Sequence, residues 1–433
     1  MCREHKRGCE GESAKVYGDH LRNKDTEPET GEILKKFFTA TDKQIYSGYT
    51  TDVYFTRTRK ILKDNGLEKL KVTAEVTTSE LPEGWVWGIF SGLAEALRLF
   101  EGKPVDIYSF REGTVFRAKS RQGVLVPVMT ITGAYYDFVL YETPLLGFLC
   151  HSSGISTVSS RYRMRCGKKT LLAFGIRRAH PAIAPMIDRA SYIGGCDAVS
   201  SIAGAELIGH PPQGTMPHAS VIVFGDSAKA FAAYSESVSG DEKKIVLVDT
   251  FSDERQESLL AAMSIKGLYG VRLDTPKSRR GSLPSIVSEV RWELNSKGYG
   301  DIKIFVSGGI SEGDLVDLID AGVDGFGVGT AISNASVIDY SLDIVEVDGS
   351  AIAKRGKFSG RKEVYRCPDC FQFDVLPEGS EVPFCNNCDL KEEKMLRKVM
   401  SNGRLVSKTE SPDETRNYVI RQLSKIRTPD MST

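Results

Sequence analysis

Short apolar strands alternate with amphipathic helices through the second half of the chain, and this rhythm constrains the fold more than any other feature. Ile245–Asp249 is a short β-branched run, and Tyr269–Asp274 and Ile302–Val306 are the next strand-like runs. Each of the three is followed by a stretch with helical spacing. A fourth run, Val323–Val328, ends the series. Consecutive parallel strands need a crossover connection, which is usually a helix, so this order predicts a parallel sheet covered by helices.

The same rhythm begins further upstream, where Leu171–Phe174 and Ala198–Ile202 have the character of strands. The number of strands fits an eight-stranded βα barrel or a close variant better than an open sheet, although the pattern is compatible with both. Before Tyr141, the strand-like run Lys71–Thr77 and the helical spacing of Gly88–Leu99 show no such repeat. We therefore predict a small α+β domain ahead of a βα barrel or a close variant of one.

Chain length and local composition divide the sequence into four predicted segments. The 433 residues exceed the usual size of one domain, and the first part of the chain is charged and poor in apolar residues. We expect a flexible tail over residues 1–40, an N-terminal α+β domain over 41–141, a βα-barrel domain over 142–345, and a return segment with a cysteine module over 346–433.

The charge balance argues against several classes of partner. The chain has 57 basic and 57 acidic residues, whereas a nucleic-acid-binding protein usually has a basic excess. It contains no run of about 18 apolar residues, and its first residues lack the apolar core of a signal peptide. We therefore expect no nucleic-acid or membrane partner and a cytoplasmic location.

Two glycine-containing turns follow the last two predicted strands. They are Ser307-Gly308-Gly309 and Gly327-Val328-Gly329-Thr330. Glycine lets backbone N–H groups approach a phosphate closely, and the following helix start adds its positive dipole end. In βα barrels phosphate is commonly held after the seventh and eighth strands, so the pair of turns favours phosphate binding over simple turn chemistry.

Charged side chains follow other strands of the predicted barrel. The pairs Arg177-Arg178 and Arg279-Arg280 suit a polyanion such as pyrophosphate, although a solvated surface explains either pair alone. Asp249 and Asp274 end neighbouring strands and are candidates to hold Mg²⁺ or sugar hydroxyls, with helix capping as the alternative.

A histidine, His218, precedes the helical run Val221–Tyr234. A lone histidine is usually structural or on the surface. At a helix start beside anion-binding strand ends, it can instead act as a nucleophile or as a general acid or base.

Two Cys-x-x-Cys pairs lie fourteen residues apart near the C-terminus. This spacing is typical of a tetrahedral zinc site, and four thiolates leave no open position for catalysis. A structural Zn²⁺ site is therefore predicted from Cys367, Cys370, Cys385 and Cys388.

Taken together, these segments resemble the nicotinate phosphoribosyltransferases, in particular the shorter form that ends in a four-cysteine module. The resemblance covers about residues 45 to 400. The motifs that carry it are Thr51-Asp52-Val53-Tyr54, Phe174–Pro181, Gly214–Ala219, Arg272-Leu273-Asp274-Thr275, Ser307-Gly308-Gly309 and Phe326–Thr330.

The resemblance implies an enzyme of NAD salvage with a type II phosphoribosyltransferase fold, in which an N-terminal α+β domain accompanies an irregular βα barrel. Such enzymes join nicotinate to 5-phosphoribosyl 1-pyrophosphate, giving nicotinate mononucleotide and pyrophosphate. The resemblance also implies Mg²⁺, ATP as a co-substrate, and a homodimer or higher oligomer with shared active sites. His218 matches the histidine that ATP phosphorylates in the family.

The resemblance assigns roles to individual residues as well. Tyr54 would enter a neighbour's barrel and stack on the pyridine ring opposite Phe174. Arg177 is expected in both catalysis and substrate binding. The other expected catalytic residues are His218, Asp249 and Asp274, and the other expected substrate-binding residues are Asp197, Thr215, Arg272, Arg279, Arg280, Ser307, Gly308, Gly309, Gly327, Gly329 and Thr330.

The choice of pyridine substrate rests on a few positions. Asp197 lies where relatives that use nicotinamide carry an acid, and a carboxylate there would repel nicotinate. Ser200 is the alternative residue to face the ring, and Arg272 is a candidate partner for the nicotinate carboxylate. Two alternatives stay open: transfer to nicotinamide or quinolinate, and a non-enzymatic barrel whose zinc module binds nucleic acid or protein.

Overall fold

The computed structural model describes residues 37–238, 242–279 and 281–426. Its internal contacts divide the chain into Met1–Ala40 and Thr41–Thr433, and every feature described below belongs to the second unit. Much of the predicted tail lies outside the described residues.

A parallel sheet forms the barrel part of the fold. Its strand order is β7-β6-β11-β10-β9-β8, and each neighbouring pair is parallel. The sheet has six strands in the described residues and its edge strands do not pair with each other, so the barrel is irregular, as predicted, and falls short of the eight-stranded variant. The strands are β6 (Thr170–Ala173), β7 (Ala198–Val199), β8 (Ile245–Leu247), β9 (Gly270–Leu273), β10 (Lys303–Val306) and β11 (Gly325–Val328).

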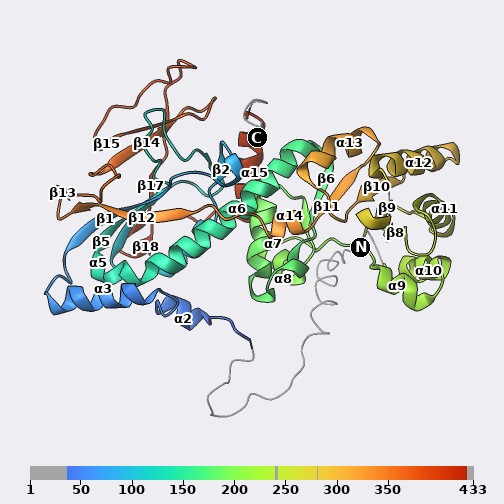
Figure 1. Ribbon diagram of the computed structural model, residues 1–433, viewed down its shortest axis with the longest axis horizontal. Helices are drawn as coiled ribbons and strands as arrows, with labels where there is room; N and C mark the ends of the chain where they lie inside the picture. The colour runs from blue at the N-terminus through green and yellow to red at the C-terminus, as the bar shows by residue number, and fades with distance from the viewer. Residues whose placement is uncertain (1–36, 239–241, 280, 427–433) are drawn as a thin grey trace, which may run out of the picture. The chain divides into compact units, whose positions relative to one another are not determined.

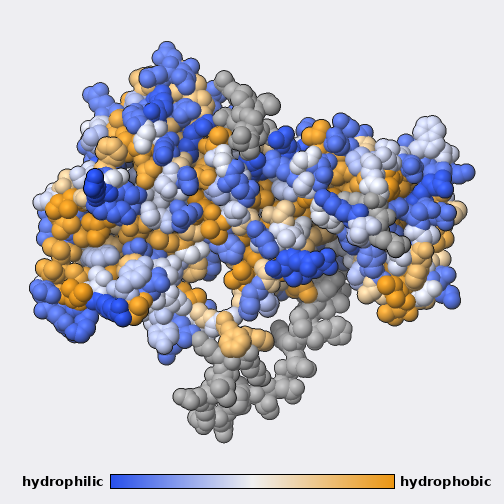
Figure 2. All heavy atoms as spheres, in the orientation of Figure 1, coloured by the Kyte–Doolittle hydropathy of each residue, from blue (hydrophilic) through white to orange (hydrophobic). Residues whose placement is uncertain are grey.

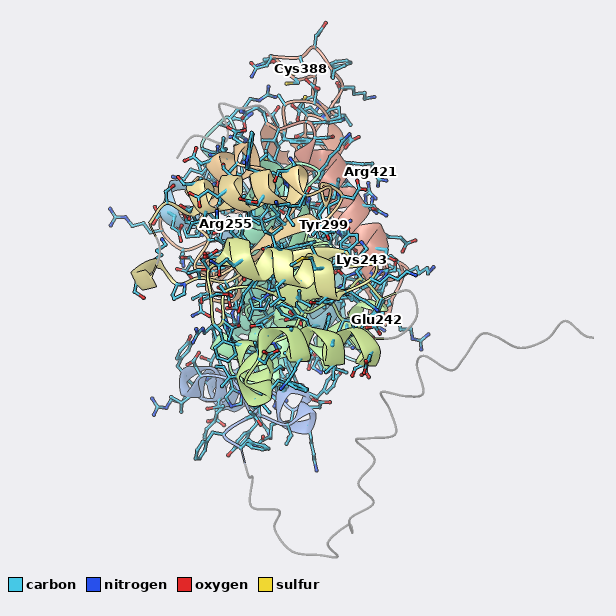
Figure 3. The ribbon with its side chains drawn as sticks, turned by 90° about the vertical axis from the view of Figure 1, so that its right-hand side faces the viewer. Glu242, Lys243, Arg255, Tyr299, Cys388 and Arg421 are labelled. Carbon is cyan, nitrogen blue, oxygen red and sulfur yellow. The ribbon has the colours of Figure 1, made fainter. Side chains whose placement is uncertain are left out.

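Helices follow the strands of this sheet in the predicted rhythm. Helices α10, α11 and α12 lie side by side along one side of it, where Figure 3 views them from outside. Buried side chains of the sheet and helices, including Val246, Val271 and Val287, form one hydrophobic core. The helices of this part are α7 (Ala184–Ile193), α8 (Ile202–Ile208), α9 (His218–Phe224), α10 (Ser227–Ser237), α11 (Glu254–Ser264), α12 (Leu283–Ser296), α13 (Leu315–Asp320) and α14 (Thr330–Ser333).

An antiparallel sheet forms the N-terminal part and combines strands from both halves of the chain. Its order is β13-β12-β1-β5-β3-β17-β18, so β1 lies between β5 and β12. Val72 of β1 faces Val347 of β12. The strands are β1 (Lys71–Thr78), β3 (Val105–Ser109), β5 (Met129–Ala134), β12 (Tyr340–Val347), β13 (Ser350–Ala351), β17 (Arg397–Ser401) and β18 (Arg404–Leu405).

Smaller elements complete this part of the chain. Helices α2 and α3 precede β1, and Figure 2 shows apolar surface over α3 and over α9 of the barrel. A three-stranded sheet of order β15-β14-β16 carries the cysteine module. The remaining elements are α2 (Asp42–Tyr46), α3 (Val53–Asp64), β2 (Gly88–Ile89), α4 (Leu93–Phe100), β4 (Val115–Phe116), α5 (Tyr135–Phe138), β14 (Lys362–Arg366), β15 (Phe373–Pro377), β16 (Glu393–Lys394) and α15 (Pro412–Leu423).

A long helix, α6 (Glu142–Cys166), joins the two sheets. It packs against α4, β2 and β12 of the N-terminal part and against α7, α13 and α14 of the barrel (Figure 1). Many of its buried residues are small serines, such as Ser153 and Ser156, which allow close packing on several sides. Because α6 touches both parts, it ties the position of the barrel strands to the antiparallel sheet.

Two helix predictions differ from the structure. The run Val221–Tyr234 belongs to two helices, because Gly225 adopts a positive φ of 67° and ends α9. The stretch Gly88–Leu99 divides into β2 and α4, since Gly92 has φ 92° and precedes the helix. Among the described residues, the model has no helix that is both long and apolar enough to cross a membrane.

Candidate active site

A cavity of about 760 Å³ opens at the carboxyl ends of the parallel strands, where ligand sites of βα folds usually lie. Residues from the ends of β6, β9, β10 and β11 line it, together with the start of α9. The structure therefore brings together most of the predicted site residues: Phe174, Arg177, Thr215, His218, Arg272, Asp274, Ser307, Gly308, Gly309, Gly327, Gly329 and Thr330.

The turn after β10 depends on glycine for its backbone conformation. Gly308 and Gly309 have φ values of 87° and 71°, which residues with a side chain rarely adopt. A Cβ atom on Gly308 would lie 2.8 Å from Oδ1 of Asp274, whereas one on Gly309 would meet nothing within 4 Å. The turn therefore packs closely on β9 at Gly308 and presents open backbone at Gly309.

The second turn uses glycine for a different reason. A Cβ atom on Gly327 would lie 2.5 Å from the ring of Phe174, so the missing side chain makes room for that aromatic wall. A Cβ atom on Gly175 would likewise lie 2.5 Å from the carbonyl oxygen of Gly329, and Thr330 starts the short helix α14. The glycine residues here shape the cavity around Phe174, in addition to freeing backbone near Gly329.

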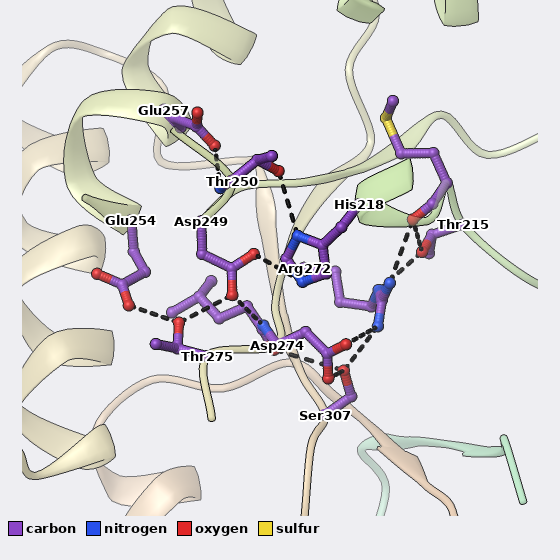
Figure 4. Close-up of polar contacts among 12 residues, drawn as sticks. Thr215, His218, Asp249, Thr250, Glu254, Glu257, Arg272, Asp274, Thr275 and Ser307 are labelled. Carbon is purple, nitrogen blue, oxygen red and sulfur yellow. Dashed lines mark hydrogen bonds and ion pairs between the residues drawn. The ribbon is translucent and has the colours of Figure 1, made fainter. Parts of the chain in front are cut away.

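Arg272 is held by a dense set of polar contacts on the cavity floor. Its Nε donates to Thr215 Oγ1 (2.7 Å) and its Nη1 to Ser307 Oγ (2.8 Å), while Nη2 donates to the carbonyl of Met216 (3.2 Å). Asp274 lies 3.3 Å from Nη1 (Figure 4). Burial lowers the pKa of Arg272, against the opposing effect of Asp274. Most of its donors are used, so Arg272 is suited to organising the floor.

His218 begins α9 and lies between two polar side chains from the loop after β8. Its Nδ1 is 3.2 Å from Thr250 Oγ1, and its Nε2 is 3.8 Å from Asp249 Oδ1. The other carboxylate oxygen of Asp249 accepts hydrogen bonds from the Asp274 backbone (3.0 Å) and from Thr275 (2.9 Å). Burial raises the pKa of Asp249, and its Oδ1 has no hydrogen-bond partner among the described residues.

Two arginines reach the cavity from the short turn after β6. Arg177 and Arg178 both line it, and neither forms an ion pair with a described residue. Exposed guanidinium groups beside a phosphate-type turn can neutralise an anionic ligand.

Asp197 lies outside this cavity, which corrects the expectation that it faces the substrate. Its carboxylate pairs with Arg163 and Arg416 (both 2.6 Å) and accepts the backbone N–H of Leu171 (2.9 Å). These contacts tie the start of β6 to α6 and α15. Ser200, three residues further on, lines the cavity instead.

Four other predicted residues are not among those that line the described cavity. Tyr54 lies on α3 with about half of its surface exposed and is not among the lining residues. Arg280 is outside the described residues, and for Arg279 the structure describes the backbone of a short helical turn, Lys277–Arg279. Asp249 lies behind His218 without lining the cavity.

The sequence reasoning missed two residues that shape the site. Tyr162 of α6 lines the cavity, and its hydroxyl donates to the carbonyl of Ile310 beside the first glycine turn (3.0 Å). Glu257 of α11 is buried and accepts hydrogen bonds from the loop that contacts His218. No local motif marks either residue, because each acts through a fold-dependent contact.

The four cysteines form a compact cluster, away from the cavity. Their sulfur atoms all lie within 4.8 Å of one another, which fits a tetrahedral thiolate site for zinc. Arg121 lies beside the cluster, with Nη1 3.6 Å from Cys385 Sγ, and pairs with Asp374 and Glu392. The cluster therefore brings the turn between β14 and β15 together with the segment before β16.

Family models match most of the chain. Residues 52–153 match the quinolinate phosphoribosyl transferase N-terminal domain, and residues 155–343 match the C-terminal domain of the same family. The boundary between the two matches falls within α6.

Known proteins are similar to the chain over most of its length. A crystal structure of nicotinate-nucleotide pyrophosphorylase from Pyrococcus furiosus is 47% identical, with a TM-score of 0.86, covering 90% of this chain and 99% of that one. A nicotinate phosphoribosyltransferase of Mycobacterium tuberculosis is 28% identical over 362 residues, 75% of this chain and 79% of that protein. Human nicotinic acid phosphoribosyltransferase shares the fold, with 19% identity, a TM-score of 0.72, and coverage of 88% and 95%.

The irregular barrel, its cavity at the strand ends and these similarities define a type II phosphoribosyltransferase. Within that class, the chain belongs to the nicotinate phosphoribosyltransferase family.

Proposed function

We propose that this protein is a nicotinate phosphoribosyltransferase, which joins nicotinate to 5-phosphoribosyl 1-pyrophosphate and releases pyrophosphate. The observation that carries the proposal is the cavity, in which two glycine turns, two unpaired arginines and an aromatic wall meet at the strand ends. The proteins named nicotinate phosphoribosyltransferase among its relatives support the same activity.

In the proposed reaction, the pyridine nitrogen attacks C1 of the ribose while the bond from C1 to pyrophosphate breaks. Little proton transfer is needed, so alignment and charge neutralisation carry the rate. Backbone around Gly309 and Gly329 holds the 5′-phosphate, and Thr330 adds a hydroxyl. Phe174 orients the ring plane, and Arg177 neutralises charge on the phosphates.

Magnesium is the proposed metal of this reaction, and the residues present fit it. The buried Asp249 Oδ1 has no hydrogen-bond partner among the described residues, and Asp274 faces the cavity nearby. Carboxylate oxygens are ligands that Mg²⁺ prefers, and when bound it neutralises charge on the leaving pyrophosphate. Asp249 and Asp274 are the proposed ligands.

The environment of Asp197 favours nicotinate over nicotinamide. Its carboxylate is engaged by two arginines outside the cavity, so the acid expected to repel nicotinate does not meet the ring. Ser200 is the proposed neighbour of the pyridine substituent. Quinolinate is the second candidate substrate, because the matching family model is named for it and because Arg177 and Arg178 could accept an additional carboxylate.

A pyrophosphate-release assay tests these choices. The purified protein is incubated with phosphoribosyl pyrophosphate, Mg²⁺ and one pyridine at a time. Fastest release with nicotinate is expected. Faster release with quinolinate would make quinolinate the proposed substrate. No release with nicotinate, nicotinamide or quinolinate would favour a non-enzymatic barrel.

ATP is the proposed co-substrate, acting through His218. The γ-phosphoryl group passes to an imidazole nitrogen with release of ADP, and later hydrolysis returns free histidine and phosphate. The contacts of His218 with Asp249 and Thr250 support this role, since they orient the imidazole. His218→Ala should abolish ATP hydrolysis and ATP stimulation while leaving some transfer; unchanged stimulation would refute the step.

A homodimer with shared sites is the proposed assembly. Tyr49, Val53 and Tyr54 are exposed around the start of α3, and Ile222 and Val223 are exposed on α9 beside the cavity. Figure 2 shows apolar surface over α9. Contact between copies through these surfaces would bring Tyr54 to a partner's pyridine ring.

Mixing two inactive variants tests the shared site. Tyr54→Ala and Arg177→Ala subunits should regain partial activity in hybrid dimers, because one site then keeps both residues. No recovery after confirmed subunit exchange would count against it.

Structural zinc is the proposed occupant of the cysteine cluster, and four reduced thiols fit a reducing compartment such as the cytoplasm. Metal analysis of the purified protein should give one zinc per chain. Cys367→Ser should lose that zinc and lower the midpoint of thermal unfolding.

A further inference from the structure

Glu257 is a buried carboxylate that the proposed reaction does not use. It lies in the first half of α11 with about 1% of its surface exposed. Its Oε2 accepts the backbone N–H of Thr250 (2.9 Å), and its Oε1 accepts the N–H of Phe251 (3.0 Å) and the hydroxyl of Ser227 (2.6 Å). Figure 4 shows the contact with Thr250. A charged acceptor buried among several donors holds those donors in one arrangement.

The groups that Glu257 holds surround His218 from two directions. Thr250 is in direct contact with Nδ1 of His218, and Asp249, its neighbour in the chain, faces Nε2. Ser227 begins α10, which follows the helix that His218 starts. One carboxylate therefore connects the loop after β8 with the α9–α10 segment.

We propose that Glu257 is a positioning residue that fixes the orientation and tautomer of His218. With the Nε2 proton directed toward Asp249, Nδ1 keeps its lone pair and accepts from the Thr250 hydroxyl. That arrangement depends on the Thr250 backbone, which Glu257 holds. The inference rests on the proposed function in giving His218 a role in ATP hydrolysis.

The substitution Glu257→Gln breaks this arrangement with little change of shape. An amide has one acceptor oxygen, so its NH₂ group must face a backbone N–H of the loop. If the amide oxygen stays with Phe251 and Ser227, the NH₂ group faces Thr250 and repels it. Ser227→Ala is the matched control, because it removes one hydrogen bond to the same carboxylate and leaves the loop contacts.

Enzyme kinetics give the first test, with unfolding midpoints to verify that each variant folds. Glu257→Gln should lower the rate of ATP hydrolysis about tenfold and leave the KM for phosphoribosyl pyrophosphate within about twofold, since the glycine turns lie on other strands. Ser227→Ala should stay within about twofold of wild type in both. Thr250→Val, which keeps the backbone N–H, should reproduce the loss if Glu257→Gln folds poorly.

A double-mutant cycle separates positioning from general structural support. Transfer activity that remains in His218→Ala should be unchanged by adding Glu257→Gln, because the residue acts through His218. An equal loss in both backgrounds would overturn the proposal.

Histidine-selective nitrogen-15 NMR gives a readout that does not require turnover. The chain has six histidines, and His218→Ala identifies the signal of His218. Glu257→Gln should shift the ring nitrogens of His218, whereas Ser227→Ala should not. An unmoved signal in an active enzyme would overturn this inference. A shifted signal in a protein without pyrophosphate release would instead refute the proposed function.

Discussion

Both large sheets have buried charged side chains, but the two sheets differ in whether those charges are paired within the protein. In the antiparallel sheet, Glu75 pairs with Lys362 (2.9 Å), and Asp343 pairs with Lys357 (2.7 Å). At the end of the parallel sheet, Asp249 keeps an oxygen without a hydrogen-bond partner among the described residues, and Arg177 faces the cavity. The first sheet neutralises its charges internally, whereas the second leaves charge available for a ligand.

The largest expected effect breaks a pair in the antiparallel sheet. Lys362→Met leaves Glu75 buried without its partner, which should lower the free energy of unfolding by about 3–5 kcal/mol. Denaturant unfolding measures the loss. Lys354→Met is the control, because Lys354 also pairs with a sheet carboxylate, Asp343, but is largely exposed, and should lose less than about 1 kcal/mol. Equal losses of stability in the two variants would contradict the expectation that burial of the ion pair determines the size of the loss.

The next effect concerns the open charges of the barrel. Arg177→Ala should lower kcat/KM about 100-fold, because a bidentate contact to phosphate is lost. The unfolding midpoint should not change, since Arg177 has no ion pair among the described residues. Arg177→Lys keeps the positive charge but not the planar guanidinium group, so its kcat/KM should lie between those of the wild type and Arg177→Ala. A large loss of stability in Arg177→Ala would remove the contrast between the sheets.

A smaller effect tests how the barrel shapes its phosphate turn. Gly308→Ala forces a side chain into positive φ and places Cβ against Asp274, so the KM for phosphoribosyl pyrophosphate should rise about tenfold. Gly309→Ala has the same sign of φ but open space, and it should raise the KM less. Steady-state kinetics measure the KM for phosphoribosyl pyrophosphate of both variants. The reverse ranking would mean that contact with Asp274 is not the constraint.

The smallest expected effect is a pH dependence at Glu142, where α6 leaves the antiparallel sheet. Burial, reinforced by Asp343, raises the pKa of Glu142 to about 7. Between the ordinary value of 4.5 and about 7, the unfolded chain ionises this group while the folded protein keeps it protonated. Raising the pH through this window should therefore cost the folded state about 1 kcal/mol.

Glu142→Gln removes that titration. Denaturant unfolding at pH 5 and pH 8 should show a smaller decrease of stability in the variant than in the wild type. Identical decreases would show that Glu142 does not contribute to the pH dependence.

Local sequence patterns predicted the barrel well, because each strand and helix there is contiguous. The expected strand Ile302–Val306 corresponds to Lys303–Val306, and the helix expected after Tyr269–Asp274 corresponds to α12, Leu283–Ser296. The cavity residues followed from the rule that strand ends meet at one edge. The helix α6 escaped prediction, since its serine-rich interior packs on several sides and lacks an amphipathic period.

Long-range contacts account for what the sequence could not reveal. Asp197 carries no local sign of its contacts with Arg163 and Arg416, which come from distant helices. Glu257 resembles any helical glutamate until the loop after β8 folds over it. Placement of β12 and β17 in the antiparallel sheet likewise depends on pairing across the chain.

That pairing has a consequence for synthesis on the ribosome. β1 is made early, but its neighbour in the sheet, β12, is made only after the whole barrel has been translated. Val72 of β1 must therefore wait for Val347 of β12 before the two can pair. Until then one edge of β1 has exposed backbone groups that can pair with other chains. We expect the nascent N-terminal part to depend on chaperones, and translation arrested before residue 340 to yield an aggregation-prone fragment despite a completed barrel.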